Sequence, residues 1–341
     1  MNTPSFLTGL AAASVLLACA REVPAVPAVT APASGWTITA VPDAWRFSGY
    51  VEDKDLSGIA VTPDFKHCLI CTDEGDGIQM GIMDRKALTV TAGATIDLLP
   101  EVNVPKTEVD TEGVAWMASD KCFYVTGSHG VSKKKGDFDA SRCHIIRIPT
   151  AADGAPLQAG VQVGSLLPWV EKNSTLSSNV RQPLQLNGFN IEGLAAKDGK
   201  LWFGVRGPNL KGDAFVIEAT PASLFTPTPE ATLHALSIGN GMGVRELVGV
   251  KEGFLILTGN ACAEATKKQP ETMAPGEDQT FRLFIWKPGT PPRLIGDVPQ
   301  PSAKAEGMLL LDETESTIDI LMLFDSAPAG GPRAYRISKA K

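Results

Sequence analysis

The chain has 341 residues, of which 43% are hydrophobic and 20% charged, and its formal net charge is −7. These values rule out a disordered acidic tail, and the acidic balance argues against a nucleic-acid partner, which would require a basic face. The 33 glycines and 25 prolines exceed the average share, which indicates many turns.

The first twenty residues have the pattern of a targeting segment. Residues 6–20 are almost all apolar or small. This run is shorter than the ~20 residues that cross a bilayer, but it has the length of a signal-peptide core. It ends in Leu16-Leu17-Ala18-Cys19, which resembles the lipobox of bacterial lipoproteins and predicts a signal peptide over 1–20 with lipidation of Cys19. The alternative is ordinary cleavage after Ala20, which would give a secreted protein.

Residues 21–35 follow as a tether. They carry Pro24, Pro27 and Pro32 among alanines and valines, and such a stretch is extended and semi-rigid. We expect it to join a lipid anchor to one folded domain, residues 36–341. The expected location is the bacterial cell envelope, on the periplasmic side or at the outer membrane, with the N-terminal lipid as the only membrane contact.

The folded part repeats one pattern, in which a polar and a small residue precede a short apolar strand. The five copies are 56–60, 111–115, 191–195, 244–248 and 305–309. A second apolar strand follows each copy, at 68–72, 121–126, 200–205, 253–258 and 317–323. A polar loop and a third strand come next, for example at 144–148, 214–218, 281–286 and 334–337. Most copies add a further strand-like run, such as 91–98 or 162–167.

Short, regularly spaced strands indicate an all-β sandwich, barrel or propeller, and the repetition favours a β-propeller. We predict five blades, or six if the long interval between residues 112 and 192 hides a degenerate copy. Only residues 221–225 have the pattern of a helical turn. The last copy lacks an obvious fourth strand, which residues 36–40 or 45–50 would supply, closing the ring.

Five cysteines follow the leader, namely Cys68, Cys71, Cys122, Cys143 and Cys262. An odd number cannot pair completely. Cys68 and Cys71 have C-x-x-C spacing, but they lie within a predicted strand, where residues i and i+3 face opposite sides. Buried free thiols are therefore expected rather than a redox or zinc site.

The repeats bring polar residues to one end of the ring. Because consecutive strands of a blade run antiparallel, the start of the first strand lies beside the end of the second. The expected neighbours are Ser57 with Asp73, Glu112 with His129, Glu192 with Arg206, Arg245 with Asn260, and Glu306 with Asp325. The opposite end receives plain turns. We therefore expect one functional mouth of the central channel.

The residues at this mouth predict a cation site beside an anion site. The carboxylates of Glu112, Glu192, Glu306, Asp73 and Asp325 are hard oxygen ligands, which suit Ca²⁺ or another divalent metal. The candidate catalytic residues are His129, Arg206 and Arg245, since cationic or donor groups stabilise a developing anion. The alternative is that these carboxylates and arginines neutralise each other in structural pairs.

Six motifs occur in order along residues 50–338. They are 111–116, 126–130, 190–195, 205–208, 243–247 and 281–286. Together they resemble a bacterial β-propeller family of unknown function, related in shape to esterase-like and phytase-like propellers. Because phytase-like propellers use calcium and hydrolyse phosphoesters, the resemblance implies a calcium-dependent activity on ester or phosphoester bonds.

Two classes of function fit these residues. The first is a metal-dependent hydrolase for a small anionic or ester substrate, in which the metal polarises the ester and activates water; a lactonase is one form of it. Glu112, Glu192 or Glu306 would then be metal ligands or a general base. The second class is a non-catalytic propeller that binds an envelope protein or a glycan.

Overall fold

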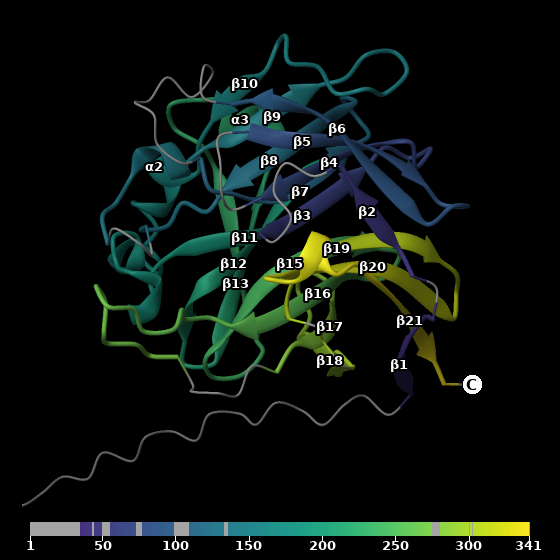
Figure 1. The fold of residues 1–341 in the computed structure, drawn as a ribbon. Coiled ribbons are helices and arrows are strands. Elements are labelled where there is room, and N and C mark those ends of the chain that lie inside the picture. The colour runs from purple at the N-terminus through teal and green to yellow at the C-terminus, as the bar shows by residue number, and fades with distance from the viewer. Residues whose placement is uncertain are drawn as a thin grey trace, which may run out of the picture.

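The computed structural model of the chain describes residues 35–42, 44–49, 55–72, 77–98, 109–132, 136–274, 280–299, 301 and 303–340. The signal peptide, Cys19, Asp73 and most of the tether lie outside the described residues. The described part folds into five β-sheets around a common centre, as Figure 1 shows. It is an all-β, five-bladed propeller.

Each blade is an antiparallel meander that begins with its innermost strand. The first blade holds β3 (Leu56–Val61), β4 (His67–Thr72), β5 (Gly77–Asp84) and β6 (Thr89–Asp97), with β2 (Arg46–Ser48) parallel to β6 at its edge. The second blade holds β7 (Thr111–Met117), β8 (Cys122–Gly127), β9 (Ile145–Pro149) and β10 (Gln162–Gly164). The third holds β11 (Asn190–Lys197), β12 (Lys200–Leu210), β13 (Asp213–Ala219) and β14 (Ala231–Ser237).

The last two blades have the same plan. The fourth holds β15 (Met242–Val250), β16 (Gly253–Asn260), β17 (Arg282–Trp286) and β18 (Arg293–Asp297). The fifth holds β19 (Lys304–Glu313), β20 (Thr317–Asp325) and β21 (Arg333–Lys339). Its outer strand is β1 (Trp36–Ala40), which pairs antiparallel with β21 from Trp36 opposite Lys339 to Ala40 opposite Tyr335.

The five inner strands surround the channel in chain order. Neighbouring strands contact each other along the series β3, β7, β11, β15 and β19, and β19 contacts β3. Five hydrophobic clusters fill the five gaps between successive blades. Because both faces of a blade are covered, its inner strands are apolar on both sides rather than alternating, which explains the continuous apolar runs in the sequence.

The long interval before the third blade contains short helices instead of a sixth blade. They are α2 (Leu167–Val170), η2 (Ser177–Asn179) and η3 (Leu184–Leu186). The predicted turn at 221–225 is α3 (Pro221–Leu224), and η1 (Ala140–Arg142) and η4 (Pro328–Gly330) complete the helices of the described residues. Within this part of the chain, no helix has the length and apolar character needed to cross a bilayer.

The five cysteines of the domain are free and buried, as predicted. Cys68 and Cys71 face opposite sides of β4, since Cys68 packs between the first and fifth blades and Cys71 between the first and second. Burial raises the pKa of Cys68 to about 12 and that of Cys71 well above its usual value. Neither thiol is thus prepared for redox or metal chemistry.

Candidate functional site

All five inner strands carry a β-bulge at the same place. In each strand the pairing with the second strand passes over one additional residue, at the polar position of the repeat. The bulged residues are Ser57, Glu112, Glu192, Arg245 and Glu306, the last together with Gly307. A bulge redirects a side chain out of the alternating strand pattern. The polar positions of the sequence repeat are therefore the positions released from regular pairing.

The glycine after the bulge lets neighbouring inner strands approach closely. A Cβ atom on Gly113 would lie 2.8 Å from the carbonyl oxygen of Glu192, and one on Gly58 would lie 2.7 Å from that of Glu112. Both contacts are with backbone, which cannot give way. The glycines thus set the distance between each bulge and the inner strand of the next blade.

The fourth blade has Glu246 where three of the other blades have Gly58, Gly113 and Gly193. The Oε1 atom of Glu246 accepts hydrogen bonds from the backbone N–H groups of Leu194, at 3.0 Å, and Leu247, at 2.9 Å. Burial raises the pKa of Glu246 well above its usual value, and the charge of Glu192 adds to this effect. The hydrogen bond from Leu194 holds the third blade against the fourth.

A chain of ion pairs connects three successive blades. Arg206 Nη1 lies 2.6 Å from Glu192 Oε1, and Arg245 Nε lies 2.9 Å from Glu192 Oε2 without the alignment of a hydrogen bond. Arg245 Nη2 also donates to Glu306 Oε1. Burial acts to lower the pKa of Arg245, but the charges of Glu192, Glu306 and Glu112 raise it above its usual value. The guanidinium of Arg245 therefore stays charged inside the channel.

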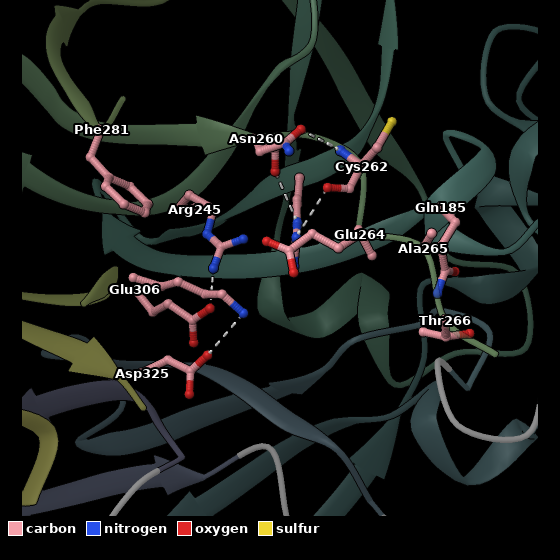
Figure 2. Close-up of a pocket in the computed structure, with 13 residues that line it drawn as sticks. Gln185, Arg245, Asn260, Cys262, Glu264, Ala265, Thr266, Phe281, Glu306 and Asp325 are labelled. Atoms are coloured by element: carbon pink, nitrogen blue, oxygen red, sulfur yellow. Dashed lines mark hydrogen bonds and ion pairs between the residues drawn. The ribbon is translucent and has the colours of Figure 1, made fainter. Parts of the chain in front are cut away.

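A pocket opens beside this chain of ion pairs. Its cavity volume is about 230 Å³. Arg245, Lys304, Glu306 and Asp325 line one end, as Figure 2 shows in part. Arg206 connects the ion pairs to the other end, since it donates to the backbone oxygens of Asn260 at 3.1 Å and Cys262 at 3.5 Å. The other end is formed by Gln185 from η3 and by residues 262–266, which follow β16. Asn260 and Phe281 complete the walls.

The pocket brings together four of the eight predicted site residues: Arg206, Arg245, Glu306 and Asp325. Glu192 lies next to it, bound to both arginines. Glu112 is a buried bulge residue whose charge acts on Arg245 but which does not line the pocket. Asp73 lies outside the described residues.

His129, the remaining predicted catalytic residue, is fully buried and does not line the pocket. Its Nδ1 lies 2.9 Å from the carbonyl oxygen of Gly127, and its Nε2 accepts a hydrogen bond from Leu166 N–H at 3.3 Å. Burial lowers the pKa of His129 to about 4. The observed contacts are those of a neutral imidazole that joins β8 to the helical insertion.

Three of the carboxylates predicted to bind calcium, those of Glu192, Glu306 and Asp325, contact basic side chains. Within the described ranges, no group of three or more His, Cys, Asp or Glu side chains is placed to hold a metal ion. Glu192 and Glu306 contact guanidinium groups, which compete with a cation for the same oxygen atoms. These contacts fit the paired alternative better than a calcium site, and calcium binding stays a prediction.

Sequence reasoning did not identify the second end of the pocket. Gln185 comes from the insertion between the second and third blades, and its backbone oxygen accepts a hydrogen bond from Met273 N–H at 2.8 Å. The residues of the 262–266 loop carry no repeated motif. Only the length of the two connections could have indicated this end of the pocket from the sequence. Long loops in compact domains commonly carry functional residues.

Solved structures with a similar shape include several enzymes. A family 43 β-1,3-galactosidase is 10% identical, with 87% of this chain and 94% of that chain covered and a TM-score of 0.49. An exo-β-1,3-galactanase from Phanerochaete chrysosporium is 9% identical, with 88% and 64% covered and a TM-score of 0.49. A streptogramin B lyase is 9% identical, with 89% and 98% covered and a TM-score of 0.39. These likenesses concern shape alone.

The sequence itself gives the family. No curated protein matches the chain. The profile of one family matches residues 55–153 and 148–336, which together cover every blade. The chain therefore belongs to the protein family of unknown function DUF3616.

Proposed function

We propose that the pocket beside the ion pairs binds a small, uncharged, hydroxyl-rich molecule such as a sugar. The observation that carries this proposal is that each basic side chain at the pocket contacts a carboxylate. Arg245 is held by two carboxylates, Arg206 by one, and Lys304 Nζ lies 3.7 Å from Asp325 Oδ2.

Such a lining favours hydroxyl groups over anions. An anionic ligand must compete with Glu192 and Glu306 for the guanidinium groups, and removing a partner from a buried pair costs several kcal/mol, about 3–5. A hydroxyl group both donates and accepts, so it can bridge Lys304 and Asp325 without separating any pair.

The end of the pocket that holds Glu306 and Asp325 supports the same class of ligand. The side chains of Glu306 and Asp325 are 12% and 14% exposed, so their oxygens are partly accessible. Phe281 lines the same end, and Asn260 adds an amide. These polar groups can fix the orientation of a bound small molecule.

The test is isothermal titration with a panel of neutral sugars, and with phosphate and acetate as anionic comparisons. We expect saturable binding of at least one sugar and about a tenfold loss of affinity in Asp325→Asn, since a hydrogen bond to a charged acceptor is replaced by one to a neutral acceptor. Asp297→Asn is the matched control, because Asp297 is 66% exposed on the outer strand β18. Binding of the anions alone, or equal losses in both variants, would overturn the proposal.

Hydrolysis is a second candidate, favoured by the two partly accessible carboxylates of Glu306 and Asp325 in one pocket. A carboxyl group can act as a general acid or base on a bound ester, phosphoester or lactone. A panel of these substrates, run with Ca²⁺ and with a chelator, tests the activity and the predicted metal together. We expect turnover that Glu306→Gln abolishes; no turnover under either condition leaves a binding protein.

We further propose that the protein acts at the cell envelope, held by a lipid on Cys19. The support is the apolar run and the lipobox-like residues before the tether.

A further inference from the structure

The Gln185 amide, at the second end of the pocket, is the least explained polar group there. The residue is 1% exposed, and its Nε2 atom is buried without a hydrogen-bond partner. Among the described residues, its Oε1 atom has no hydrogen bond either. A buried amide without partners is costly and rare in folded proteins.

The backbone around Gln185 is firmly placed, so the amide is not a loosely held surface group. Leu184 and Gln185 accept backbone hydrogen bonds from Ala263 at 3.4 Å and Met273 at 2.8 Å. The η3 helix is thereby fixed to the loop that forms the same end of the pocket. Leu184, the residue before Gln185, is 3% exposed and packs in the core.

A carboxamide without hydrogen-bond partners has a specific chemical complement. It offers two N–H donors and one carbonyl acceptor on one planar group. Another amide carries a carbonyl acceptor and an N–H donor and can satisfy both sides at once. A 180° rotation of the Gln185 amide presents the same two functions, so the match does not depend on its orientation.

The neighbouring wall fits the acyl part of such a group. Cys262, Ala263 and Ala265 line this end with small side chains, and Thr266 adds a hydroxyl. Figure 2 shows Gln185 beside Thr266 and Ala265, with Glu306 and Asp325 at the opposite side of the pocket. A ligand that spans the pocket therefore meets the Gln185 amide at one end and the Lys304 and Asp325 pair at the other, with Glu264 between them.

We propose that this end is an amide-recognising subsite and that the ligand is an N-acylated amino sugar. Its hydroxyl groups bind at the Lys304 and Asp325 end, and its acylamino group pairs with Gln185. This inference rests on the proposed binding of a hydroxyl-rich molecule and specifies its class.

The test compares matched sugar pairs by isothermal titration on the full chain. The probes are N-acetylglucosamine with glucose, and N-acetylgalactosamine with galactose. We expect the N-acetyl sugar of at least one pair to bind about tenfold more tightly, which corresponds to satisfying one buried polar group. In Gln185→Leu this preference disappears, so that the N-acetyl sugar and its parent sugar bind with the same dissociation constant.

Two controls keep the outcomes distinct. Gln182→Leu changes an exposed glutamine three residues earlier and leaves the preference intact. Because Gln185→Leu removes no hydrogen bond within the described protein, it does not lower the melting temperature; Gln185→Met gives a second variant of similar size. Equal binding within both pairs, or a preference that survives in Gln185→Leu, overturns the amide subsite alone. No binding of any sugar to the wild type overturns the proposed function as well.

Discussion

Arg245 joins two carboxylates from different blades, and its replacement by methionine tests the role of the ion pairs directly. The arginine is 3% exposed and contacts Glu192 and Glu306. Methionine keeps an unbranched apolar chain but supplies no charge. The variant therefore leaves the carboxylates of both neighbouring blades without this guanidinium.

The expected destabilisation follows from burial. Removing one partner of a buried ion pair costs about 3–5 kcal/mol. The lower end applies here, because Glu192 keeps Arg206 at 2.6 Å and the Glu306 side chain is 12% exposed. About 3 kcal/mol lowers the melting temperature of a domain of this size by about 6 °C.

Differential scanning calorimetry and urea unfolding measure this change. The control is Arg336→Met, which removes an arginine that contacts both oxygens of Asp319 at 2.7 Å but is 55% exposed. A surface pair of this kind contributes about 0–1 kcal/mol. If Arg245→Met costs no more than Arg336→Met, the ion pairs at the channel do not hold the blades together.

Three further outcomes are expected. Gly113→Ala places a methyl group 2.8 Å from backbone atoms of the next blade and is expected to cost about 2–3 kcal/mol of stability, measured by urea unfolding. The control Gly93→Ala is expected to cost much less, because the nearest neighbouring atom is 3.7 Å from the added methyl group. Similar losses in the two variants would contradict the close approach of the inner strands. The pKa of His129 is about 4 in the folded protein against 6.5 as the reference. The unfolded state thus binds the additional proton, and stability falls by about 3 kcal/mol as the pH drops through this interval. His129→Asn flattens this pH profile; an unchanged slope would assign it to other groups. Cys19→Ala moves the expressed protein from the membrane to the soluble fraction, and retention in membranes would refute the lipid anchor.

The repeat could be recognised from the sequence because the inner strands of each blade are formed by residues that lie close together in the chain. Each copy carries its own polar residue, small residue and apolar strand within a few positions, so the blades and the shared mouth could be predicted. The residues at the bulges coincide with the second residue of each predicted copy. The register that produces a bulge was not predictable, since it depends on the pairing of two strands.

The partners of the mouth residues could not be predicted for a different reason. Arg245 meets Glu192 and Glu306, which are 53 and 61 positions away, only because the ring places three blades side by side. Carboxylates that the sequence predicts to lie close together can either bind a metal ion or pair with arginines. Only the distances in the structure distinguish these two arrangements. Gln185 was missed because an isolated glutamine in a long insertion has no pattern.

The shared bulge also has a consequence for relatives of this protein. A bulged residue takes no part in the ladder between its strand and the next, so its replacement leaves the hydrogen bonds of the sheet in place. Substitutions at positions 57, 112, 192, 245 and 306 therefore act through side-chain contacts and not through the ladder. Those at 192, 245 and 306 are coupled, because these three residues form one chain of ion pairs. Members of the family that keep residues 192, 245 and 306 are expected to keep the same chain of ion pairs, and those that change one of the three are expected to change its partners as well.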